Sequence, residues 1–401
     1  MGELVIRNIG VLYSPLGNDI LELENASIRV ENGVITEVAQ GLLTPSTDEG
    51  EVLDAGRRIA LPGFVDPHTH SVFAGDRSNE LIMKLKGYTY LQILERGGGI
   101  AKTLRETRRA PLEELTRGLE DRLEEFRRHG ITAIEIKSGY GMDQKTEIKQ
   151  LEAAGMARGI KKRARTFLGA HIIPPEYRER REEYVAFLVD EMIPLVAEKG
   201  LADYVDVFCD EGVYTLDEAE EILKAGKRAG LRLKIHSDEI KNLGATRMAA
   251  ELGATSADHL VLSEEEDLEA MARHGTVPVL LPGTVFTTFL PQYPNARKML
   301  EMELPVALAT DYNPNCPLQN PIFLGQLAVY KMKMLPEEVL RSLTINAARA
   351  INMEEDVGSI EVGKRGDIVL LNSRSLTEVF YRIGHDPVWA VIEEGEVVFR
   401  R

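Results

Sequence analysis

Two histidines one residue apart, His68 and His70, are the residues of this chain that most directly suggest chemistry. They follow a short apolar run that begins at Leu61. Positions two apart on an extended strand point to the same side, so both imidazoles can reach one point in space. A metal ion bound there would need further ligands from elsewhere in the chain. A pair of unrelated strand-end histidines is the alternative, because short motifs also match by chance.

Histidines are concentrated at the ends of the predicted strands. Five of the eight lie at such ends: His68, His70, His171, His236 and His259. Asp311 follows a later apolar run, where capping a turn before Pro314 would be its alternative role. Three neutral imidazoles and one carboxylate suit zinc, and iron(II) or manganese are possible. The sequence predicts that His68, His70, His236 and Asp311 hold one divalent metal ion, zinc or iron, which would lower the pKa of a bound water.

A second metal ion usually requires a bridging carboxylate, often a carbamylated lysine. In barrel hydrolases that lysine comes from the fourth strand of the barrel. The fourth predicted strand of this chain, Tyr204 to Cys209, leads into Phe208-Cys209-Asp210 and offers no lysine there. The nearest lysine is Lys137 on the second predicted strand. One metal ion is therefore the favoured interpretation.

Glu239 and His259 are the candidate acid and base. Glu239 stands three residues after His236, and a carboxylate at a helix start is its alternative role. His259 follows Asp258 and could instead be a satisfied core histidine, although a proton shuttle is favoured. Which of the two activates water stays open. Neither Cys209 nor Cys316 carries a sequence signal of a nucleophile.

These residues can converge only if the strands that carry them share one edge of a sheet. Continuous apolar runs alternate with charged, helix-forming stretches such as Pro111 to His129 and Leu216 to Ala229. The predicted strands are Gly63 to His70, Ile131 to Ser138, Arg165 to His171, Tyr204 to Cys209, Arg232 to His236, Ser256 to Leu260, Thr276 to Leu281 and Pro305 to Thr310. This size and rhythm predict an α/β fold with a (β/α)₈ TIM barrel. A doubly wound sheet would usually place a glycine-rich phosphate turn after its first strand, and none follows His70.

Both ends of the chain predict short strands instead. Asn32-Gly33 between apolar runs indicates a hairpin, and a similar pattern returns at residues 366–371 and 390–398. Neither end is long enough to form a good core alone. We therefore predict a composite β-sandwich domain from residues 1–56 and 357–401, and a barrel domain from residues 57–356.

Composition narrows the possible partners. The formal charge of −16 disfavours nucleic acid and anionic membranes, and it requires a local cation for any anionic small-molecule substrate. The first residues lack the features of a secretion signal, and no apolar run approaches the length of a membrane helix. Two distant cysteines fit a reducing compartment. A cytoplasmic protein without nucleic-acid or membrane partners is expected.

The sequence resembles the amidohydrolase superfamily and, within it, most closely the imidazolonepropionase family. The segments that carry this resemblance are Pro62 to His70, Val72 to Arg77, Gly97 to Ile100, Lys137 to Gly141, Thr166 to His171, Lys234 to Glu239, His259, Asp311 and Gly358 to Asp367. They span almost the whole chain. The combination of Ala-Gly-Asp-Arg with the triple glycine is highly specific.

The resemblance implies hydrolysis of a cyclic amide, imidazolone propanoate, to N-formimidoyl-L-glutamate in histidine degradation. It also implies the metal ligands named above and acid/base roles for Glu239 and His259. Arg77 matches the arginine that holds the propanoate carboxylate, a task suited to its planar fork. The substrate-binding residues implied in this way are Arg77, Tyr140, His171, Glu239, Asn313, Asn315 and Cys316. Related enzymes are commonly homodimers, so a homodimer is expected.

One segment departs from the family pattern. After Asp311 the family usually has Asn-Pro-Gly and then Thr or Ser, whereas this chain has Asn313-Pro314-Asn315-Cys316. Asn can adopt the left-handed conformation of Gly at a small cost. A thiol is a weaker hydrogen-bond partner than a hydroxyl. The substitutions predict a change in affinity or specificity rather than loss of the metal chemistry.

Two other functions are compatible with parts of this pattern. A heterocycle aminohydrolase of the nucleobase deaminase type also has paired histidines, a His-x-x-Glu, a further His and an Asp, but it has no propanoate for Arg77 to bind. A non-catalytic barrel scaffold would be expected to lose metal ligands, and this chain keeps all four.

Overall fold

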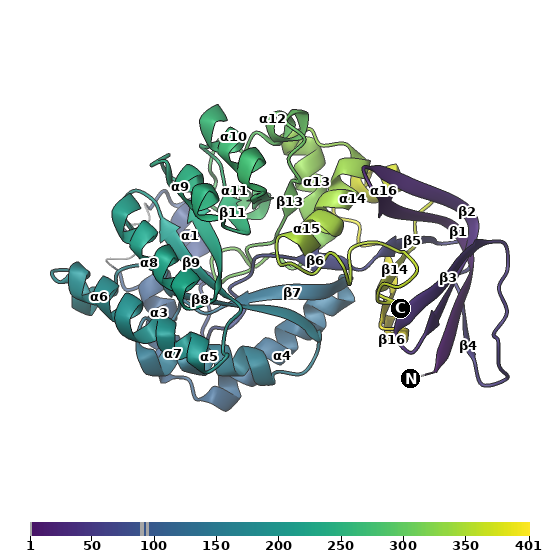
Figure 1. Cartoon of the computed structure of the whole chain (residues 1–401), viewed down its shortest axis with the longest axis horizontal. Coiled ribbons are helices and arrows are strands. Elements are labelled where there is room, and N and C mark those ends of the chain that lie inside the picture. The colour runs from purple at the N-terminus through teal and green to yellow at the C-terminus, as the bar shows by residue number, and fades with distance from the viewer. Residues whose placement is uncertain (1, 89–91, 94–95) are drawn as a thin grey trace.

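The computed structural model describes residues 2–88, 92–93 and 96–401, and these residues form two eight-stranded sheets side by side (Figure 1). One sheet is parallel, in the order β13-β12-β11-β10-β9-β8-β7-β6. Its strands are β6 (Phe64–Asp66), β7 (Ile131–Lys137), β8 (Lys162–Ala170), β9 (Tyr204–Cys209), β10 (Arg232–Ser237), β11 (Ser256–His259), β12 (Val277–Leu280) and β13 (Ala307–Leu308). Each predicted barrel strand has a counterpart here, so the barrel prediction is confirmed.

The segments after the first and last strands of this sheet close the ring. Thr69 forms a parallel bridge with Tyr312. The amide of Asp311 donates to the carbonyl of His68 at 3.1 Å, and that of His70 donates to Tyr312 at 2.9 Å. The ring closure therefore places Asp311 beside both histidines.

The strands at this closure are shorter than predicted. β6 ends at Asp66 and β13 at Leu308, whereas regular strands to His70 and Thr310 were expected. Pro67 has no amide hydrogen to continue the ladder after β6. His68 and His70 thus lie just beyond a strand rather than within it.

Helices follow the strands and cover the barrel. They are α1 (Asn79–Leu85), α3 (Gly99–Arg109), α4 (Leu112–Arg128), α5 (Gln144–Met156), α6 (Arg181–Phe187), α7 (Ile193–Glu198), α8 (Leu216–Arg228), α9 (Ala245–Leu252), α10 (Glu265–His274), α11 (Pro282–Thr287), α12 (Ala296–Glu301), α13 (Pro321–Met332), α14 (Pro336–Leu343), α15 (Ile345–Arg349) and α16 (Leu376–Tyr381), with short 3₁₀ and π turns at Pro175–Tyr177 and Leu188–Met192. In α4, Leu115, Leu119, Leu123 and Phe126 form one buried stripe, as the three- and four-residue spacing dictates. No helix among the described residues is long and apolar enough to span a bilayer.

The second sheet joins the two ends of the chain, which lie near each other in Figure 1. Its order is β16-β15-β14-β5-β1-β2-β3, with β4 also pairing with β1. The strands are β1 (Glu3–Leu16), β2 (Asp19–Glu31), β3 (Val34–Gln40), β4 (Glu51–Asp54), β5 (Ile59–Pro62), β14 (Ile368–Leu371), β15 (Val388–Glu393) and β16 (Glu396–Arg400). β5 belongs to this sheet, and only Gly63 separates it from β6; the exact domain division stays a prediction.

Alternate residues of this terminal sheet face two different cores. On β14, Ile368 and Leu370 pack in an aliphatic cluster within the sheet region, whereas Val369 and Leu371 pack in the large cluster that includes the barrel helices. The period of two explains this division. It also explains why β14 is apolar at every position.

Candidate functional site

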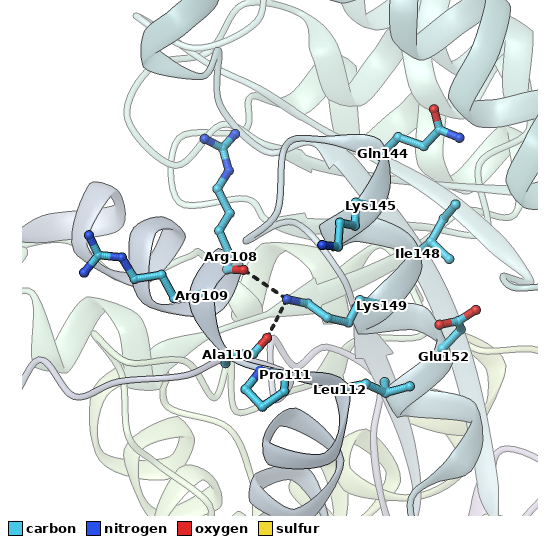
Figure 2. A pocket seen from close by; sticks show the side chains of 10 residues that line it. All are labelled: Arg108, Arg109, Ala110, Pro111, Leu112, Gln144, Lys145, Ile148, Lys149 and Glu152. Atoms are coloured by element: carbon cyan, nitrogen blue, oxygen red, sulfur yellow. Dashed lines mark hydrogen bonds between the residues drawn. The ribbon is translucent and has the colours of Figure 1, made fainter.

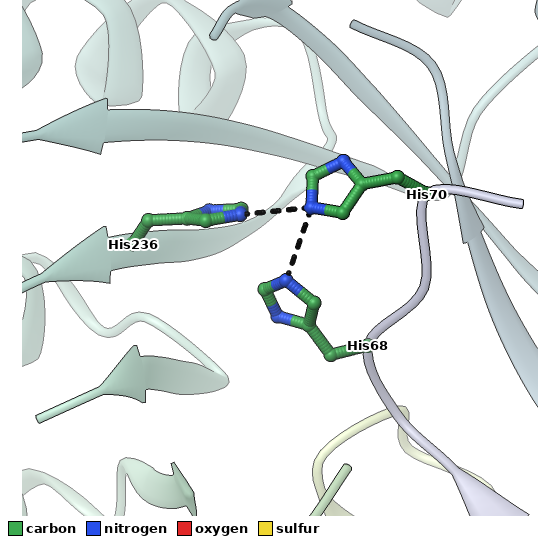
Figure 3. A group of neighbouring side chains, drawn as sticks. All are labelled: His68, His70 and His236. Atoms are coloured by element: carbon green, nitrogen blue, oxygen red, sulfur yellow. Dashed lines mark hydrogen bonds between the residues drawn. The ribbon is translucent and has the colours of Figure 1, made fainter. Parts of the chain in front are cut away.

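Three histidines converge at the carboxyl ends of the parallel strands (Figure 3). The Nε2 atoms of His68 and His236 lie 3.3 and 3.4 Å from Nε2 of His70. Donors around a tetrahedral zinc ion, each about 2.1 Å from the metal, lie about 3.4 Å apart. The spacing of these nitrogens thus fits a common metal ion, and His68, His70 and His236 could hold one.

Asp311 completes the cluster. Its Oδ1 lies 3.5 Å from His68 Nε2 and 3.4 Å from His70 Nε2. Oδ2 accepts a hydrogen bond from the Thr284 hydroxyl, whereas Oδ1 is buried without a hydrogen-bond partner among the described residues. A buried carboxylate oxygen without a partner is costly, and a cation would compensate for it.

Two carboxylates behind the cluster orient the imidazoles. Asp258 Oδ2 lies 2.6 Å from Nδ1 of His68, and Asp206 Oδ1 lies 3.1 Å from Nδ1 of His236. A hydrogen bond at Nδ1 fixes the ring and leaves Nε2 as the coordinating atom. This arrangement is typical of metal-binding histidines.

Two buried lysines balance these carboxylates. Lys137 Nζ lies 2.7 Å from both Glu135 Oε1 and Asp206 Oδ2, and Lys234 Nζ lies 3.9 Å from Glu135 and from Asp258. All five side chains are fully buried. We call Glu135, Lys137, Asp206, Lys234 and Asp258 the buried ion network. Sequence analysis missed its role, although charged residues within a buried strand such as Ile131–Lys137 were a signal of inward-facing polar positions.

The histidines differ in their protonation. Burial and Lys137 oppose the charge of His68, but its hydrogen bond to Asp258 and the nearby Asp311 carboxylate outweigh them and raise its pKa to about 9. Burial lowers the pKa of His70 and of His236. Burial would raise the pKa of Asp311, yet the close approach of His68 and His70 holds it well below its usual range. Asp311 is therefore a carboxylate, as a ligand must be.

A cavity of about 620 Å³ opens above the cluster. Of the predicted site residues, all but His68 and Cys316 line it; these are His70, Arg77, Tyr140, His171, His236, Glu239, His259, Asp311, Asn313 and Asn315. The structure thus brings ten of the twelve predicted site residues together around one space. A cavity of this size suits a small molecule.

Glu239 and His259 face each other in this cavity. His259 Nδ1 lies 3.6 Å from Glu239 Oε2, and burial raises the pKa of the Glu239 carboxyl. Asp210 holds the segment after β10 in place, because its carboxylate accepts hydrogen bonds from the amides of residues 239, 240 and 241. The pair can hold and move protons beside the metal-binding cluster.

Arg77 lies at another part of the cavity wall and already has an acidic neighbour. Its Nε and Nη2 donate to Glu80 Oε2 at 3.0 and 2.8 Å, and the side chains of both residues are buried. Glu80 Oε1 accepts from the amide of Gly99, which begins α3. The triple glycine is thereby tied to Arg77 through Glu80.

Aromatic rings form a further part of the wall. The rings of His70 and His171 stack with centroids 4.9 Å apart, and Tyr140 lies 5.3 Å from His171. Phe208 lies 6.4 Å from both His171 and His259. Phe208 was not predicted as a site residue; its place at the end of β9 was the available signal. Burial, with His70 nearby, lowers the pKa of His171 to about 3, so this ring is neutral.

The loop after β13 departs from what the sequence suggested. Asn313 Oδ1 accepts from the amides of Asn315 and Cys316, and its Nδ2 donates to the Asp311 carbonyl at 2.7 Å. The described residues with a positive φ include Asp311 but not Asn315, so no left-handed conformation is needed at Asn315. Cys316 is fully buried behind the wall, with Sγ 3.6 Å from the Thr310 carbonyl.

A second hollow of similar size lies between α3, α4 and α5 (Figure 2). Its central cation, Lys149, donates to the carbonyls of Thr107, Arg108 and Ala110 at 3.1, 3.2 and 2.6 Å. Lys149 therefore caps the end of α3, as cations at helix C-termini do.

A family model described as the amidohydrolase family matches residues 59–398. The chain belongs to the amidohydrolase family. Among similar amidohydrolases, an imidazolonepropionase from Alkaliphilus metalliredigens is 42% identical over 394 residues, covering 95% of this chain and 93% of that protein. An imidazolonepropionase from Bacillus thuringiensis is 42% identical over 398 residues, covering 98% and 93%.

Solved structures agree on the amidohydrolase architecture. The crystal structure of an adenosine deaminase from Xanthomonas campestris, with bound zinc, matches with a TM-score of 0.74 and 18% identity, covering 99% of this chain and 92% of that chain. At this identity the likeness concerns the fold alone. The barrel and the resemblance to amidohydrolases expected from sequence are both confirmed.

Proposed function

We propose that this amidohydrolase is an imidazolonepropionase, which hydrolyses imidazolone propanoate to N-formimidoyl-L-glutamate. The observation that carries the proposal is the set of relatives with this name at 42% identity over nearly the full length of both chains. A cavity with a metal-binding cluster and a buried arginine supports it. The nucleobase substrate of a deaminase would offer no carboxylate for Arg77 to bind.

We propose one divalent metal ion, zinc or iron, held by His68, His70, His236 and Asp311. When bound, it would act as a Lewis acid and lower the pKa of water toward neutrality. The count of one is supported by Lys137, whose ammonium lies between Glu135 and Asp206 and is therefore not poised as a carbamylated bridging ligand. Ligand type alone does not separate zinc from iron.

Cleavage of the cyclic amide requires a proton to leave the attacking water and another to reach the departing ring nitrogen. Glu239 and His259 are the proposed carriers, because they face each other at 3.6 Å inside the cavity. The raised pKa of Glu239 brings this carboxyl nearer to the pH at which it can both accept and donate. Tyr140, His171, Asn313, Asn315 and Cys316 remain proposed substrate residues, with Cys316 acting from behind the wall.

Arg77 is proposed to hold the propanoate carboxylate. Substituting Arg77→Ala should raise KM about tenfold to a hundredfold, because a hydrogen bond to a charged group contributes about 1.5–3 kcal/mol. Metal content should stay unchanged. Since this change leaves Glu80 buried without its cation, the double variant Arg77→Ala/Glu80→Gln separates loss of the clamp from misfolding. Loss of metal in both variants would show that Arg77 belongs to the metal site instead.

The deciding experiment is to supply imidazolone propanoate to metal-loaded protein and follow the loss of its ultraviolet absorbance. Turnover with formation of N-formimidoyl-L-glutamate is expected. Turnover of guanine or cytosine with none of imidazolone propanoate would favour the aminohydrolase alternative. Absence of metal in the purified protein, with ligand binding intact in His68→Ala, would favour a scaffold.

A homodimer in the cytoplasm is the remaining part of the proposal. Two observations support it: both cysteines are free and buried, and apolar side chains of α1 and α11, including Leu85 and Phe286, are exposed. Sedimentation analysis of the metal-loaded protein should give twice the mass of one chain.

A further inference from the structure

Lys84 on α1 contacts Asn315 in the loop after β13. Asn315 lines the cavity and stands where the family pattern usually has glycine. Lys84 Nζ lies 2.6 Å from Asn315 Oδ1 and 3.5 Å from the Thr287 carbonyl. Lys84 is about half buried, while the next lysine of the chain, Lys86, is exposed. The contact joins residues 231 positions apart.

This contact fixes the orientation of the Asn315 amide. An ammonium group can only donate, so the atom that it meets must be the carbonyl oxygen of the amide. The NH₂ group of Asn315 is therefore turned away from Lys84. Because Asn315 lines the cavity, that NH₂ group is the donor that this side chain can offer to a ligand.

The other polar side chains of the loop are already engaged. Asn313 bonds to its own backbone through both Oδ1 and Nδ2. The Cys316 thiol points to the Thr310 carbonyl behind the wall. Of Asn313, Asn315 and Cys316, Asn315 is thus the residue whose side chain can still donate to a ligand in the cavity.

The charges of Lys84, Arg77 and Glu80 favour the binding of an anion in this part of the cavity. Arg77 and Glu80 both act electrostatically on Lys84. Two cations and one carboxylate leave a net charge of +1 at this part of a chain whose formal charge is −16. Arg77 and Asn315 both line the same cavity. A ligand carboxylate placed between them would find donors from both residues.

We propose that Lys84 is a specificity-determining positioning residue, which holds the Asn315 amide as a second N–H donor to the substrate carboxylate beside Arg77. The inference rests on the proposed function, since the propanoate group of that substrate supplies the carboxylate. Lys84 acts through Asn315 and does not itself touch the ligand.

Calorimetric binding to the metal-loaded protein tests this without turnover. The probes are imidazole propanoate and imidazole propanamide, which carry no cyclic amide bond to hydrolyse. Asn315→Gly should weaken propanoate binding about tenfold or more, the worth of one hydrogen bond to a charged group, and should change propanamide binding little. Lys84→Met should weaken propanoate binding several-fold, and Lys86→Met, the matched control, should not.

The double variant Lys84→Met/Asn315→Gly decides whether Lys84 acts through Asn315. If it does, the double variant binds propanoate no more weakly than Asn315→Gly alone, because coupled residues are not additive. Additive losses would overturn the proposal by showing a direct charge effect of Lys84. Equal losses of affinity for imidazole propanoate and imidazole propanamide would overturn it, because the carboxylate would then play no part in the effect. Failure of the proposed function is distinct: wild-type protein would not turn over imidazolone propanoate, whatever these binding constants are.

Discussion

The two sheets of this molecule differ most in the charged side chains that they bury. The terminal sheet has its own aliphatic cluster, which includes Ile6, Ile28 and Leu370. The barrel instead buries the five charged side chains of the ion network directly behind the histidines. Burial of aliphatic side chains is favourable by itself. Burial of charge is costly unless each group has a partner, so the network indicates where orientation of side chains matters most.

Backbone strain shows the same contrast. In the terminal sheet, positive φ angles fall on asparagines such as Asn25, within β2, and Asn32, at the turn before β3, because Asn tolerates them. At the barrel mouth they fall on Asp238, His259 and Asp311, with φ of 56°, 80° and 50°. Such conformations cluster where the surrounding structure determines them. Stability should therefore be sensitive to changes in both regions, but activity only to changes in the barrel.

The largest effect should come from the metal cluster. His236→Ala removes one of three converging nitrogens, so bound metal should be lost and turnover should fall at least about a thousandfold, since metal catalysis supplies several kcal/mol. Elemental analysis and the absorbance assay measure both. His274→Ala, at the exposed end of α10, is the matched control and should behave as wild type. Retained metal with lost turnover would show that His236 is not a ligand.

The next effect should come from the ion network. Lys137→Met leaves Glu135 and Asp206 buried without their cation and should lower the free energy of unfolding by about 3–5 kcal/mol. Denaturant titration measures this. The double variant Lys137→Met/Glu135→Gln removes one of the stranded charges and should recover part of the loss. A loss below about 1 kcal/mol for the single variant would mean that the network stabilises little.

The fold was largely predictable because its signals are local. Continuous apolar runs such as Ile131–Ser138 identify strands buried on both faces, and charged stretches between them identify the helices. The ends of strands were less predictable: beyond β6 and β13 the ring closes through an isolated bridge between Thr69 and Tyr312 rather than through regular strands. That contact joins distant parts of the chain, and no local pattern specifies it.

Part of the candidate site could likewise be predicted from the sequence, and part could not. Strand-end histidines and Asp311 could be identified because parallel strands bring their carboxyl ends to one edge. Asp206 and Lys137 were not assigned roles, because the partners of a buried charge depend on which strands are neighbours. The Lys84–Asn315 contact was missed for a related reason, since α1 and the loop after β13 meet only in the folded chain.

The pH dependence of the free energy of unfolding tests the barrel site without any substitution. In metal-free protein the pKa of His68 is raised from 6.5 to about 9 by its bond to Asp258 and by the nearby Asp311 carboxylate, which outweigh burial. The folded state then holds a proton that the unfolded state releases, so the free energy of unfolding should fall as the pH rises from about 7 to 9. Bound metal displaces that proton, so saturating zinc should flatten this slope. Denaturant titrations with chelator and with zinc at several pH values measure it, and equal slopes in both would contradict the assignment.

The smallest effect should come from the aliphatic core of the terminal sheet. Ile28 is fully buried on β2, opposite Ile6 on β1, and belongs to the cluster that contains no barrel strand. Ile28→Val removes one methylene group and should lower the free energy of unfolding by about 0.5–1.5 kcal/mol. Because Ile28 packs in a cluster that holds no residue of the ion network, kcat/KM and metal content should equal those of wild type. Asp258→Asn in the same assays should lower kcat/KM, since loss of the carboxylate that orients His68 should weaken metal binding about tenfold to a hundredfold. If Ile28→Val lowered kcat/KM as much as Asp258→Asn, the two sheets would be energetically coupled and the separation of stability from activity would be wrong.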